Sequence, residues 1–423
     1  MKKILFVLII CCTTHLRAAD TKISDYVIGQ SHIINSDALN EAVTLEIYQP
    51  PTEKKNLPIL FLLDSQHHFP HAIAVQQFTS EYNQSPEFMV VGIRTTDDSR
   101  SRWFYTQKEE FLAFFKSELI PYLEKGFPVG QERLLFGWEF AGSLIISTMT
   151  TDSELFNGYI TASPTPIYGR YFPHAKADFD AFKQQLKSGR LKNTFFYFSQ
   201  SMHDFPVQYG LENLLKLKNN YPQHLQWSYR QWQHVTHSGT GFPTLLDGIK
   251  SYYHNYPYLR ASEVGLEKFL QKGGIGHIAP YYTSRKIRFG FTQEETDKAV
   301  KITHLSLVLQ AVSENNYAAF EDFMQTFYAS PEALENEHPN QLFNISMFYL
   351  QHGKSEKSLN LLNLLVKKYP DSPRPINGIG DNYWSLGDQK KARKYYQQAV
   401  KMARDNQHWR LSEFEMDLQK LSN

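Results

Sequence analysis

The stretch LLFGWEFAG, residues 134–142, is the part of the sequence that best indicates how this protein folds. Its first half has the character of a buried strand, and an apolar helix is expected to follow at residues 143–149. Small residues such as Gly137 and Gly142 would let the chain turn sharply from strand into helix. Glu139 stands at the centre of that turn, where the backbone would be strained and the side chain exposed beside the helix N-terminus. Ligands of α/β proteins bind at this edge of the sheet, so the turn is the first candidate site.

On either side of this turn, between about residues 42 and 258, short apolar runs alternate with amphipathic segments. The expected strands are residues 42–48, 59–63, 88–93, 134–137, 158–162, 194–199 and 225–229. Continuous apolar runs of this kind indicate strands that are buried on both faces, as in a mostly parallel sheet. Helices are expected at 110–123, where Pro121 predicts a kink, and at 178–186 and 209–219. The alternation predicts an α/β fold in which helices flank a mostly parallel sheet.

The C-terminal part of the sequence is helical and contains an internal repeat with a 34-residue period. The paired positions are Leu342–Ile376, Ile345–Ile379, Tyr349–Tyr383, Gly353–Gly387, Ser358–Ala392, Leu362–Tyr396 and Leu365–Ala399. The pattern resembles the tetratricopeptide repeat (TPR), a helix–turn–helix unit that stacks on its neighbours. Residues 307–331 are interpreted as an earlier, degenerate unit. An all-α helical-repeat domain is therefore expected, and its concave groove could bind a protein or peptide partner.

Residues 1–19 have the features of a secretory signal peptide. Lys2 and Lys3 precede an apolar run at residues 4–12 that is too short to span a bilayer. Both cysteines of the sequence lie in this segment, so the mature chain would have no disulfide and no thiol nucleophile. We therefore expect a periplasmic or secreted protein with no membrane span once the signal is removed.

The composition and length exclude several classes of protein. The 423 residues include 44 basic and 43 acidic side chains, and loss of residues 1–19 would change the formal net charge from +1 to −2. That balance predicts no nucleic-acid partner. A mean hydropathy of −0.45 excludes a polytopic membrane protein. The length exceeds one ordinary domain. After the signal peptide, we expect an α/β domain at 20–260, a linker at 261–300 and the repeat domain at 301–423.

Several motifs, in the same order along the chain, resemble the putative esterase family of α/β-hydrolases, which includes esterase D and enterochelin-esterase-like proteins. They are Leu62-Leu63-Asp64, Val91-Gly92-Ile93-Arg94, Arg100-Ser101-Arg102, the helix at 111–123, Phe156–Pro164 and His237–Gly248. The resemblance covers roughly residues 25–255. It implies an α/β-hydrolase fold, carboxylic-ester hydrolysis, a small ester-like ligand, and no cofactor or metal. It also makes the turn at 137–142 the nucleophile elbow of the family.

The sequence departs from the family at the nucleophile, because Glu139 stands where the family has serine. A carboxylate is a poorer nucleophile toward a carbonyl, and its charge would repel the negative charge that develops in the oxyanion hole. The oxyanion donors would be the backbone N–H of Phe140 and one near Ser65 or Gln66. Ser143 lies one helical turn beyond Glu139 and cannot simply replace it. Ordinary serine-esterase activity is therefore expected to be lost or altered.

The other two members of a catalytic triad follow in the α/β-hydrolase order of elbow, acid and histidine. The resemblance implies that His237 is the histidine, because its distance to Pro243 matches the family. His234, three residues earlier, is a rival. Asp204 is the carboxylate that follows the strand expected at 194–199. The sequence therefore predicts that Glu139, Asp204 and His237 form one site.

Three interpretations of Glu139 remain open at this point. The first is a decayed hydrolase that tolerates the charge at a helix N-terminus. In the second, Glu139 and His237 bind a cationic or polar group, and in the third Glu139 is a general base or a carboxylate nucleophile. The α/β domain is accordingly either an exported esterase-type enzyme, active or altered, or a non-catalytic pseudo-hydrolase that binds a ligand or a protein.

Three other groups of residues have simpler interpretations. His67, His68 and His71 suggest a metal site, but no cysteine or carboxylate cluster completes it, and a surface loop is expected there. The aromatic run at 103–105 fits an ordinary core better than the wall of a pocket. The basic run at 390–394 fits a solvated face of the repeat domain rather than a nucleic-acid patch.

Overall fold

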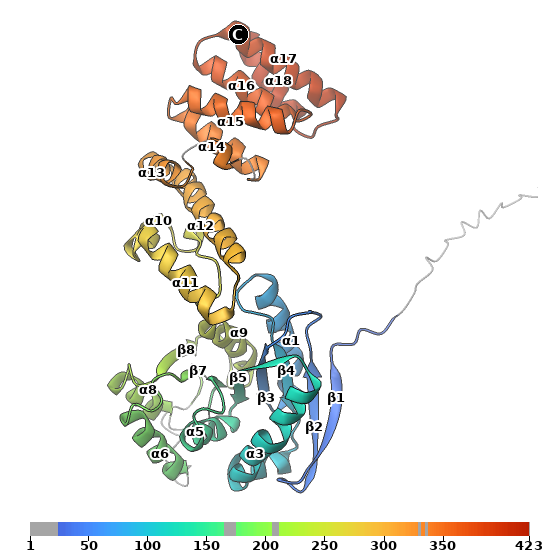
Figure 1. Ribbon diagram of the computed structural model, residues 1–423, viewed down its shortest axis with the longest axis vertical. Helices are drawn as coiled ribbons and strands as arrows, with labels where there is room; N and C mark the ends of the chain where they lie inside the picture. The colour runs from blue at the N-terminus through green and yellow to red at the C-terminus, as the bar shows by residue number, and fades with distance from the viewer. Residues whose placement is uncertain (1–23, 165–174, 205–210, 329–330, 335–336, 423) are drawn as a thin grey trace, which may run out of the picture. The chain divides into compact units, whose positions relative to one another are not determined.

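The chain divides into two compact units, residues 1–252 and 253–423, and each is described by itself (Figure 1). The computed structural model describes residues 24–164, 175–204, 211–328, 331–334 and 337–422. The expected signal peptide, residues 1–19, lies outside the described residues.

The first unit is built on an eight-stranded sheet. Its strands are β1 (Gln30–Ser36), β2 (Glu41–Tyr48), β3 (Leu57–Leu63), β4 (Met89–Ile93), β5 (Val129–Trp138), β6 (Gly158–Ala162), β7 (Phe195–Ser201) and β8 (Gln226–Trp232). The order across the sheet is β1-β2-β4-β3-β5-β6-β7-β8. β2 pairs antiparallel with β1 and β4, and every neighbouring pair from β4 to β8 is parallel. The predicted mostly parallel sheet is confirmed.

The burial of each strand follows from its sequence. β3, β4, β6 and β7 are buried along their whole length, as continuous apolar runs require when helices cover both faces of a sheet. β2 alternates instead, with Val43, Leu45 and Ile47 buried between partly exposed residues. β1 was not predicted, because it is a mostly exposed edge strand without a strong apolar pattern.

Helices surround the sheet of the first unit (Figure 1). They are α1 (Ser65–Glu81), α2 (Asp97–Ser101), α3 (Lys108–Phe114), α4 (Ile120–Gly126), α5 (Ala141–Thr151), α6 (Lys176–Lys187), α8 (Leu211–Asn220) and α9 (Gly241–Tyr252). α1 packs against α9, and α5 packs against α3 and α6. A π-helical turn, Phe115–Leu119, joins α3 to α4 and places Pro121 in the first turn of α4, where its missing N–H breaks no helical hydrogen bond.

The second unit is built of helices joined by turns and loops, and its described residues contain no strand. Its helices are α10 (Leu266–Gln271), α11 (Ile278–Phe289), α12 (Gln293–Ser313), α13 (Tyr317–Phe327), α14 (Pro339–Gln351), α15 (Ser355–Lys368), α16 (Pro373–Ser385), α17 (Gln389–Asp405) and α18 (Leu411–Gln419). α14 packs against α15 and α16 against α17, and a glycine with positive φ, Gly353 or Gly387, lies in the turn of each hairpin. Residues 261–300, expected to be a linker, hold α10, α11 and the start of α12. Their apolar side chains, such as Phe269 and Tyr282, are buried in the core of the second unit.

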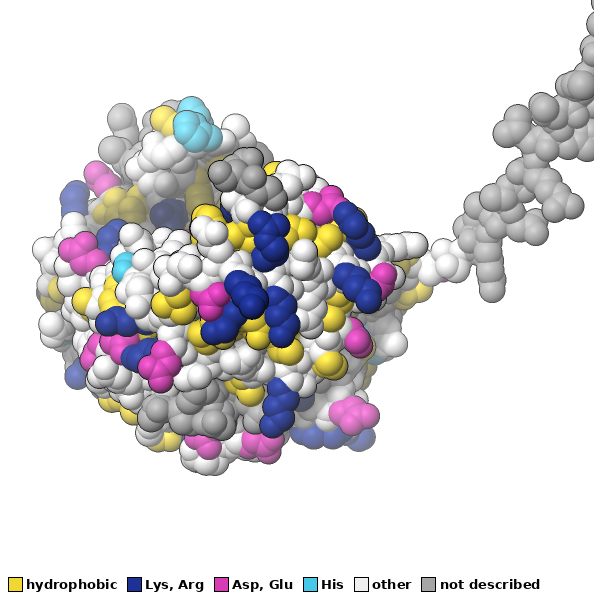
Figure 2. Space-filling model, turned by 90° about the horizontal axis from the view of Figure 1, so that it is seen from above, with side chains coloured by type: hydrophobic (Ala, Val, Ile, Leu, Met, Phe, Trp, Pro, Cys, Tyr) yellow, Lys and Arg dark blue, Asp and Glu magenta, His cyan; other side chains and the backbone are white. Residues whose placement is uncertain are grey.

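Two surface features bear on the predicted partners. The basic side chains of residues 390–394 are exposed on α17. Figure 2 shows one face of the molecule, on which Lys and Arg side chains gather beside hydrophobic ones. Within the described ranges, no helix combines the length and apolar character needed to cross a membrane.

Candidate functional site

The turn between β5 and α5 has the strained geometry of a nucleophile elbow. Glu139 has a φ of 52°, in the left-handed region that side chains other than glycine rarely adopt. Its backbone N–H donates to the carbonyl oxygen of Ala162 at 2.9 Å, and its own carbonyl accepts from the N–H of Gly142 at 2.8 Å. The fold therefore holds Glu139 in the conformation that exposes the central residue of an elbow.

Close packing explains the small residues around Glu139. A Cβ atom on Gly137 would lie 2.6 Å from the Cβ of Ala141, and a Cβ on Gly142 would lie 2.4 Å from the Cβ of Pro164. Real Cβ atoms do not approach one another this closely. Both glycines are therefore required by the close approach of strand, helix and loop.

The carboxylate of Glu139 is bound to Arg100. The Nη2 of Arg100 donates to the Oε2 of Glu139 at 3.0 Å, while its Nε donates to the Oδ2 of Asp64 at 2.8 Å. The guanidinium also lies 6.0 Å from the ring centroid of Trp138 and 5.4 Å from that of Phe140, the two neighbours of Glu139. Arg100 thus joins the end of β3 to the elbow.

The electrostatics of this cluster favour a paired state. Burial raises the pKa of the Asp64 carboxyl, while Arg100 and a hydrogen bond from Thr95 act in the opposite direction. Burial also disfavours the charge of Arg100, but Asp64 and then Glu139 outweigh it and raise the pKa of Arg100. Because arginine keeps its charge in proteins, Asp64 at 2.8 Å is held as its carboxylate partner.

The structure brings Asp204 and His237 together. The Nδ1 of His237 lies 2.6 Å from the Oδ1 of Asp204, and the N–H of Ser201 donates to the Oδ2 of Asp204 at 2.8 Å. Burial would raise the pKa of Asp204, but the hydrogen bonds from His237 and its other neighbours lower it. It is His237, and not its rival His234, that pairs with the acid.

Glu139 and His237 belong to one site. The hydrogen bond to Asp204 raises the pKa of His237, burial opposes this, and the negative charge of Glu139 raises the pKa further. The indole N–H of Trp138, beside Glu139, donates to the backbone carbonyl of His237 at 3.3 Å. The ring centroids of Trp138 and His237 are 5.4 Å apart. All three predicted catalytic positions therefore surround the same edge of the sheet.

The two predicted oxyanion donors both stand at helix starts. Phe140 immediately precedes α5, and Ser65 is the first residue of α1, so their N–H groups have no acceptor within the helix. Asp64 and Glu139 are the residues directly before them, and Arg100 bridges these two carboxylates. The hydroxyl of Ser65 donates to the Oε2 of Glu46 at 2.6 Å. One arginine thus lies beside both candidate donors, a connection that the sequence analysis missed.

The histidines at 67–71 do not form the expected surface loop. They lie in the first turns of α1, and His68 is only 6% exposed. Its ring lies edge-on to Phe136 and Trp138, and neither of its ring nitrogens has a hydrogen-bond partner among the described residues. Burial lowers the pKa of His68 to about 3, and the neighbouring histidines add to this. No group of three potential metal-binding side chains occurs in the described part of the chain.

The aromatic run at 103–105 serves two purposes. Trp103 and Phe104 are buried, as expected of core residues. Tyr105 stacks on Phe140 with ring centroids 5.6 Å apart and planes 26° apart. It therefore adds an aromatic surface next to Glu139, whereas an ordinary core position was the expectation from the sequence.

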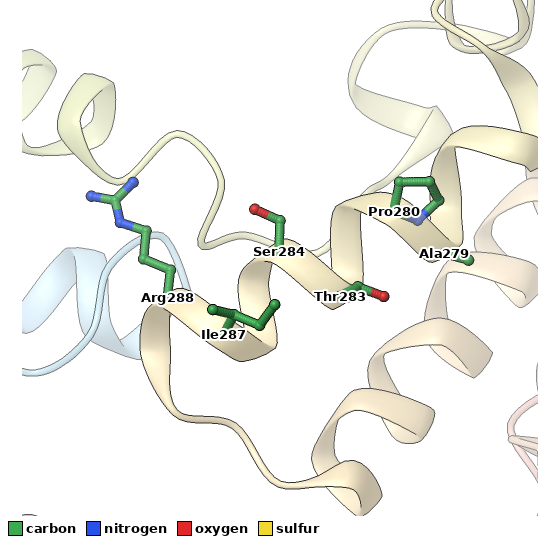
Figure 3. Close-up of a pocket in the computed structure, with 6 residues that line it drawn as sticks. All are labelled: Ala279, Pro280, Thr283, Ser284, Ile287 and Arg288. Atoms are coloured by element: carbon green, nitrogen blue, oxygen red, sulfur yellow. The ribbon is translucent and has the colours of Figure 1, made fainter. Parts of the chain in front are cut away.

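A separate open hollow of about 700 Å³ lies along α11 in the second unit (Figure 3). Its lining residues are Ala279, Pro280, Thr283, Ser284, Ile287 and Arg288. Figure 3 shows that these side chains come from successive turns of one helix. Arg288 is the one charged residue among them, and its Nη1 donates to Asn255 at 2.7 Å. The hollow lacks the converging acid, base and donor groups that surround Glu139.

Comparisons with known families cover both units. A sequence model of the family described as "Putative esterase" matches residues 36–253. Models described as "Tetratricopeptide repeat" match residues 342–372 and 374–406, which confirms the predicted repeats. The degenerate unit expected at 307–331 lies outside these matches. No curated protein matches the sequence significantly.

Solved structures resemble this chain at low sequence identity, and the first of the following shares its fold. An IroE-like serine hydrolase from Shewanella oneidensis is 18% identical, with a TM-score of 0.50, covering 71% of this chain and 99% of that one. An uncharacterised protein from Capnocytophaga ochracea is 16% identical, with a TM-score of 0.48, over 92% of this chain and 99% of that one. The enterobactin esterase FES from Shigella flexneri is 15% identical, with a TM-score of 0.45, over 54% and 59%.

Proposed function

The chain belongs to the putative esterase family, and we propose that its α/β domain binds a small polar or cationic ligand without hydrolysing esters through an acyl-serine intermediate. The observation that carries this proposal is the ion pair between Glu139 and Arg100 at the elbow. The residue that would attack the substrate is a carboxylate already engaged by a fixed cation.

The charge arrangement opposes ester hydrolysis. In a serine esterase, two backbone N–H groups stabilise the negative charge that develops on the substrate oxygen. Here the candidate donors, Phe140 and Ser65, each follow a carboxylate residue. Arg100 offsets that negative charge, but its donors to Glu139 and Asp64 are already in use. The geometry therefore stabilises the resting charges rather than a new oxyanion.

The histidine is also poorly suited to act as a general base. Asp204 and Glu139 both raise the pKa of His237, so the imidazole keeps its proton over a wider pH range. A protonated imidazole cannot accept the proton of a nucleophile, but it can donate a hydrogen bond to a ligand. Glu139 would accept a hydrogen bond from the same ligand or pair with a cation on it, against the rings of Phe140 and Tyr105.

A second candidate function is altered hydrolysis, in which His237 activates a water molecule directly. The 2.6 Å hydrogen bond between Asp204 and His237 favours it, because that pairing orients a catalytic histidine in serine hydrolases. This activity would need neither Glu139 as a nucleophile nor a burst of product. It would survive Glu139→Ala and would be lost in His237→Ala.

The proposal is tested by assaying the mature protein with p-nitrophenyl acetate. We expect the native protein to release p-nitrophenol at the background rate, and Glu139→Ser to show a burst followed by turnover. Glu139→Ala is the control for simple removal of the charge, and Ser143→Ala in the Glu139→Ser background excludes the neighbouring hydroxyl.

Two outcomes would contradict the proposal. A burst from the native protein that His237→Ala abolishes would show that acyl transfer survives. A Glu139→Ser protein that is folded by circular dichroism and still inert would show that the assigned acid, histidine or oxyanion donors are not a catalytic set.

We also propose that the protein is exported to the periplasm or secreted. Lys2, Lys3 and the short apolar run in residues 1–19 support this proposal. Expression of the full chain with a C-terminal tag, followed by N-terminal sequencing of the exported fraction, should give a mature chain beginning at Ala19 or Asp20. Recovery of the protein only from the cytoplasm with Met1 intact would contradict export.

A further inference from the structure

Ser163 is a buried residue with a strained backbone at the edge of the sheet where the candidate site lies. It directly follows β6, whose last residue, Ala162, accepts the hydrogen bond from the N–H of Glu139. The side chain of Ser163 is fully buried, and its φ is 44°, a left-handed conformation that is unfavourable for any residue with a Cβ atom. Glycine would adopt this conformation without strain. The hydroxyl group of Ser163 is therefore the feature to explain, because strained residues are retained where their side chains are needed.

The hydroxyl of Ser163 reaches both members of the Asp204–His237 pair. It is a hydrogen-bond partner of the carboxylate of Asp204. Its Oγ also lies 3.0 Å from the Oγ1 of Thr240, a second fully buried hydroxyl. Thr240 in turn donates to the backbone carbonyl of His237 at 2.9 Å. One hydroxyl therefore links the side chain of the acid to the backbone of the histidine.

The carboxylate of Asp204 is held from three directions. Its Oδ1 lies 2.6 Å from the Nδ1 of His237, and its Oδ2 accepts from the N–H of Ser201 at 2.8 Å. Burial raises the pKa of Asp204, and hydrogen bonds from His237, then Ser163, then Ser201 lower it. A buried carboxylate keeps its charge only when such donors surround it. Ser163 is thus the one side chain besides His237 that stabilises the charged acid through a hydrogen bond.

A second pair of buried hydroxyls nearby has no such connection to the acid. Ser199 in β7 is as fully buried as Ser163, and its Oγ lies 2.6 Å from the Oγ1 of Thr244 in α9. This pair also fastens the sheet to the helix that follows His237. Neither of its hydroxyls acts on the charge of Asp204 or of His237. Ser199 is therefore a matched comparison for Ser163, with the same side chain, the same burial and a threonine partner.

We propose that Ser163 is the positioning residue of the Asp204–His237 pair. Its hydroxyl holds the carboxylate of Asp204 and, through Thr240, the backbone of His237. The strained backbone at residue 163 is retained because it directs the hydroxyl to both partners. The inference rests on the proposed function and deepens it, since the imidazole held in this way is the one that would donate to the ligand beside Glu139.

The test compares Ser163→Ala, Ser163→Gly and the control Ser199→Ala in the mature full chain. NMR titration follows the side-chain carboxyl carbon of Asp204, assigned with Asp204→Asn. We expect both Ser163 variants to raise the pKa of Asp204, because the carboxylate loses a donor, and Ser199→Ala to leave it unchanged. Urea unfolding should show Ser163→Gly to be more stable than Ser163→Ala, because glycine relieves the strain. A merely structural role would make the titration follow stability, whereas positioning by the hydroxyl predicts the same change in both variants.

A kinetic measurement adds a second readout. In the Glu139→Ser background, Ser163→Ala should lower kcat for p-nitrophenyl acetate by about tenfold with little change in KM, because the histidine is less well oriented. An inert Glu139→Ser protein would contradict the proposed function, and the titration of Asp204 would still decide the role of Ser163.

Three results would overturn the inference. They are an unchanged pKa of Asp204 in either Ser163 variant, the same change in Ser199→Ala, or an unchanged kcat for Ser163→Ala in an active Glu139→Ser background. Should Ser163→Ala fail to fold, Ser163→Gly gives the decisive titration, because it lacks the hydroxyl and carries no strain.

Discussion

Two arginines, one in each unit, are buried to a similar extent and treated in opposite ways. Arg100 lies between the carboxylates of Asp64 and Glu139, with a hydrogen bond to each. Arg374 is held by the neutral amide of Asn340 and has Arg410 as a charged neighbour. The pKa of Arg100 is raised by its partners, whereas that of Arg374 is lowered.

The difference shows that the same type of side chain can be neutralised within the chain at one place and left without a carboxylate partner at another. The charge of Arg100 is satisfied within the chain, so it stabilises the elbow and fixes Glu139. Among the described residues, no carboxylate lies within ion-pair distance of Arg374, and its hydrogen bond goes to a neutral amide. The following three predictions sharpen or break this contrast.

The largest effect is expected from Asp64→Asn. Asparagine keeps the left-handed backbone of residue 64, whose φ is 54°, but it removes the negative charge that Arg100 faces. The variant loses the buried carboxylate and leaves Arg100 paired only with the more exposed Glu139, so we expect the free energy of unfolding to fall by about 3 kcal/mol. Urea unfolding followed by circular dichroism measures the change.

The matched control for that variant is Asp98→Asn. Asp98 pairs with Arg102 at 2.9 Å, but its side chain is 80% exposed, so the loss should stay below about 0.5 kcal/mol. Equal effects of the two substitutions would mean that Arg100 gains nothing from its internal carboxylates, and the contrast between the two arginines would fail.

The next effect concerns His68, a buried base with no described partner. Its pKa is about 3 in the folded chain against 6.5 as the ordinary value, so the unfolded chain binds the extra proton between these pH values. Stability should therefore fall as pH decreases from 6.5 toward 3. Residue 68 cannot titrate in His68→Gln, so the free energy of unfolding of this variant should depend less on pH below 6.5. Unfolding curves measured at several pH values test this.

His71→Gln provides the comparison, because His71 is an exposed histidine on the same helix. It should retain most of the acid sensitivity of the native chain. If His68→Gln and the native protein lose stability in parallel on acidification, His68 is not buried as a neutral base.

The smallest effect is expected from Glu139→Gln on the titration of His237. The charge of Glu139 favours the imidazolium form, so its neutralisation should lower the pKa of His237. Asp204→Asn should lower it more, because the hydrogen bond that His237 donates to Asp204 is the larger cause. NMR titration of the His237 ring measures both shifts. A pKa of His237 that does not move in Glu139→Gln would place Glu139 and His237 in separate environments.

Local patterns in the sequence predicted a large part of the fold. The apolar runs gave most of the strands, because a strand buried on both faces needs continuous hydrophobic residues. The 34-residue spacing gave the two repeat hairpins, because a stacked unit must bury the same positions each time. The glycines at 137 and 142 gave the elbow, because a side chain at either position would overlap its neighbours. Each of these signals is carried by the same residues that form the predicted feature.

Other elements were not predicted, because their sequences carry no clear periodic pattern. The strand at 30–36 lies at the edge of the sheet and buries little, so its composition resembles that of a loop. The helices at 266–289 are short and were expected to be a linker. The first turns of the helix at 65–81, where His67, His68 and His71 lie, were expected to be a surface loop after a strand. In each case, packing against distant elements outweighs local preference.

The sequence by itself determined that a glutamate occupies the centre of the elbow and that an acid and a histidine follow in the α/β-hydrolase order. Only the tertiary structure decided what surrounds that glutamate. Arg100 is 36 residues from Asp64 and 39 from Glu139 along the chain, yet parallel strands bring the ends of β3 and β5 to the same edge of the sheet. A sequence pattern records which residues follow one another, whereas the partner of a charge depends on which strands lie side by side.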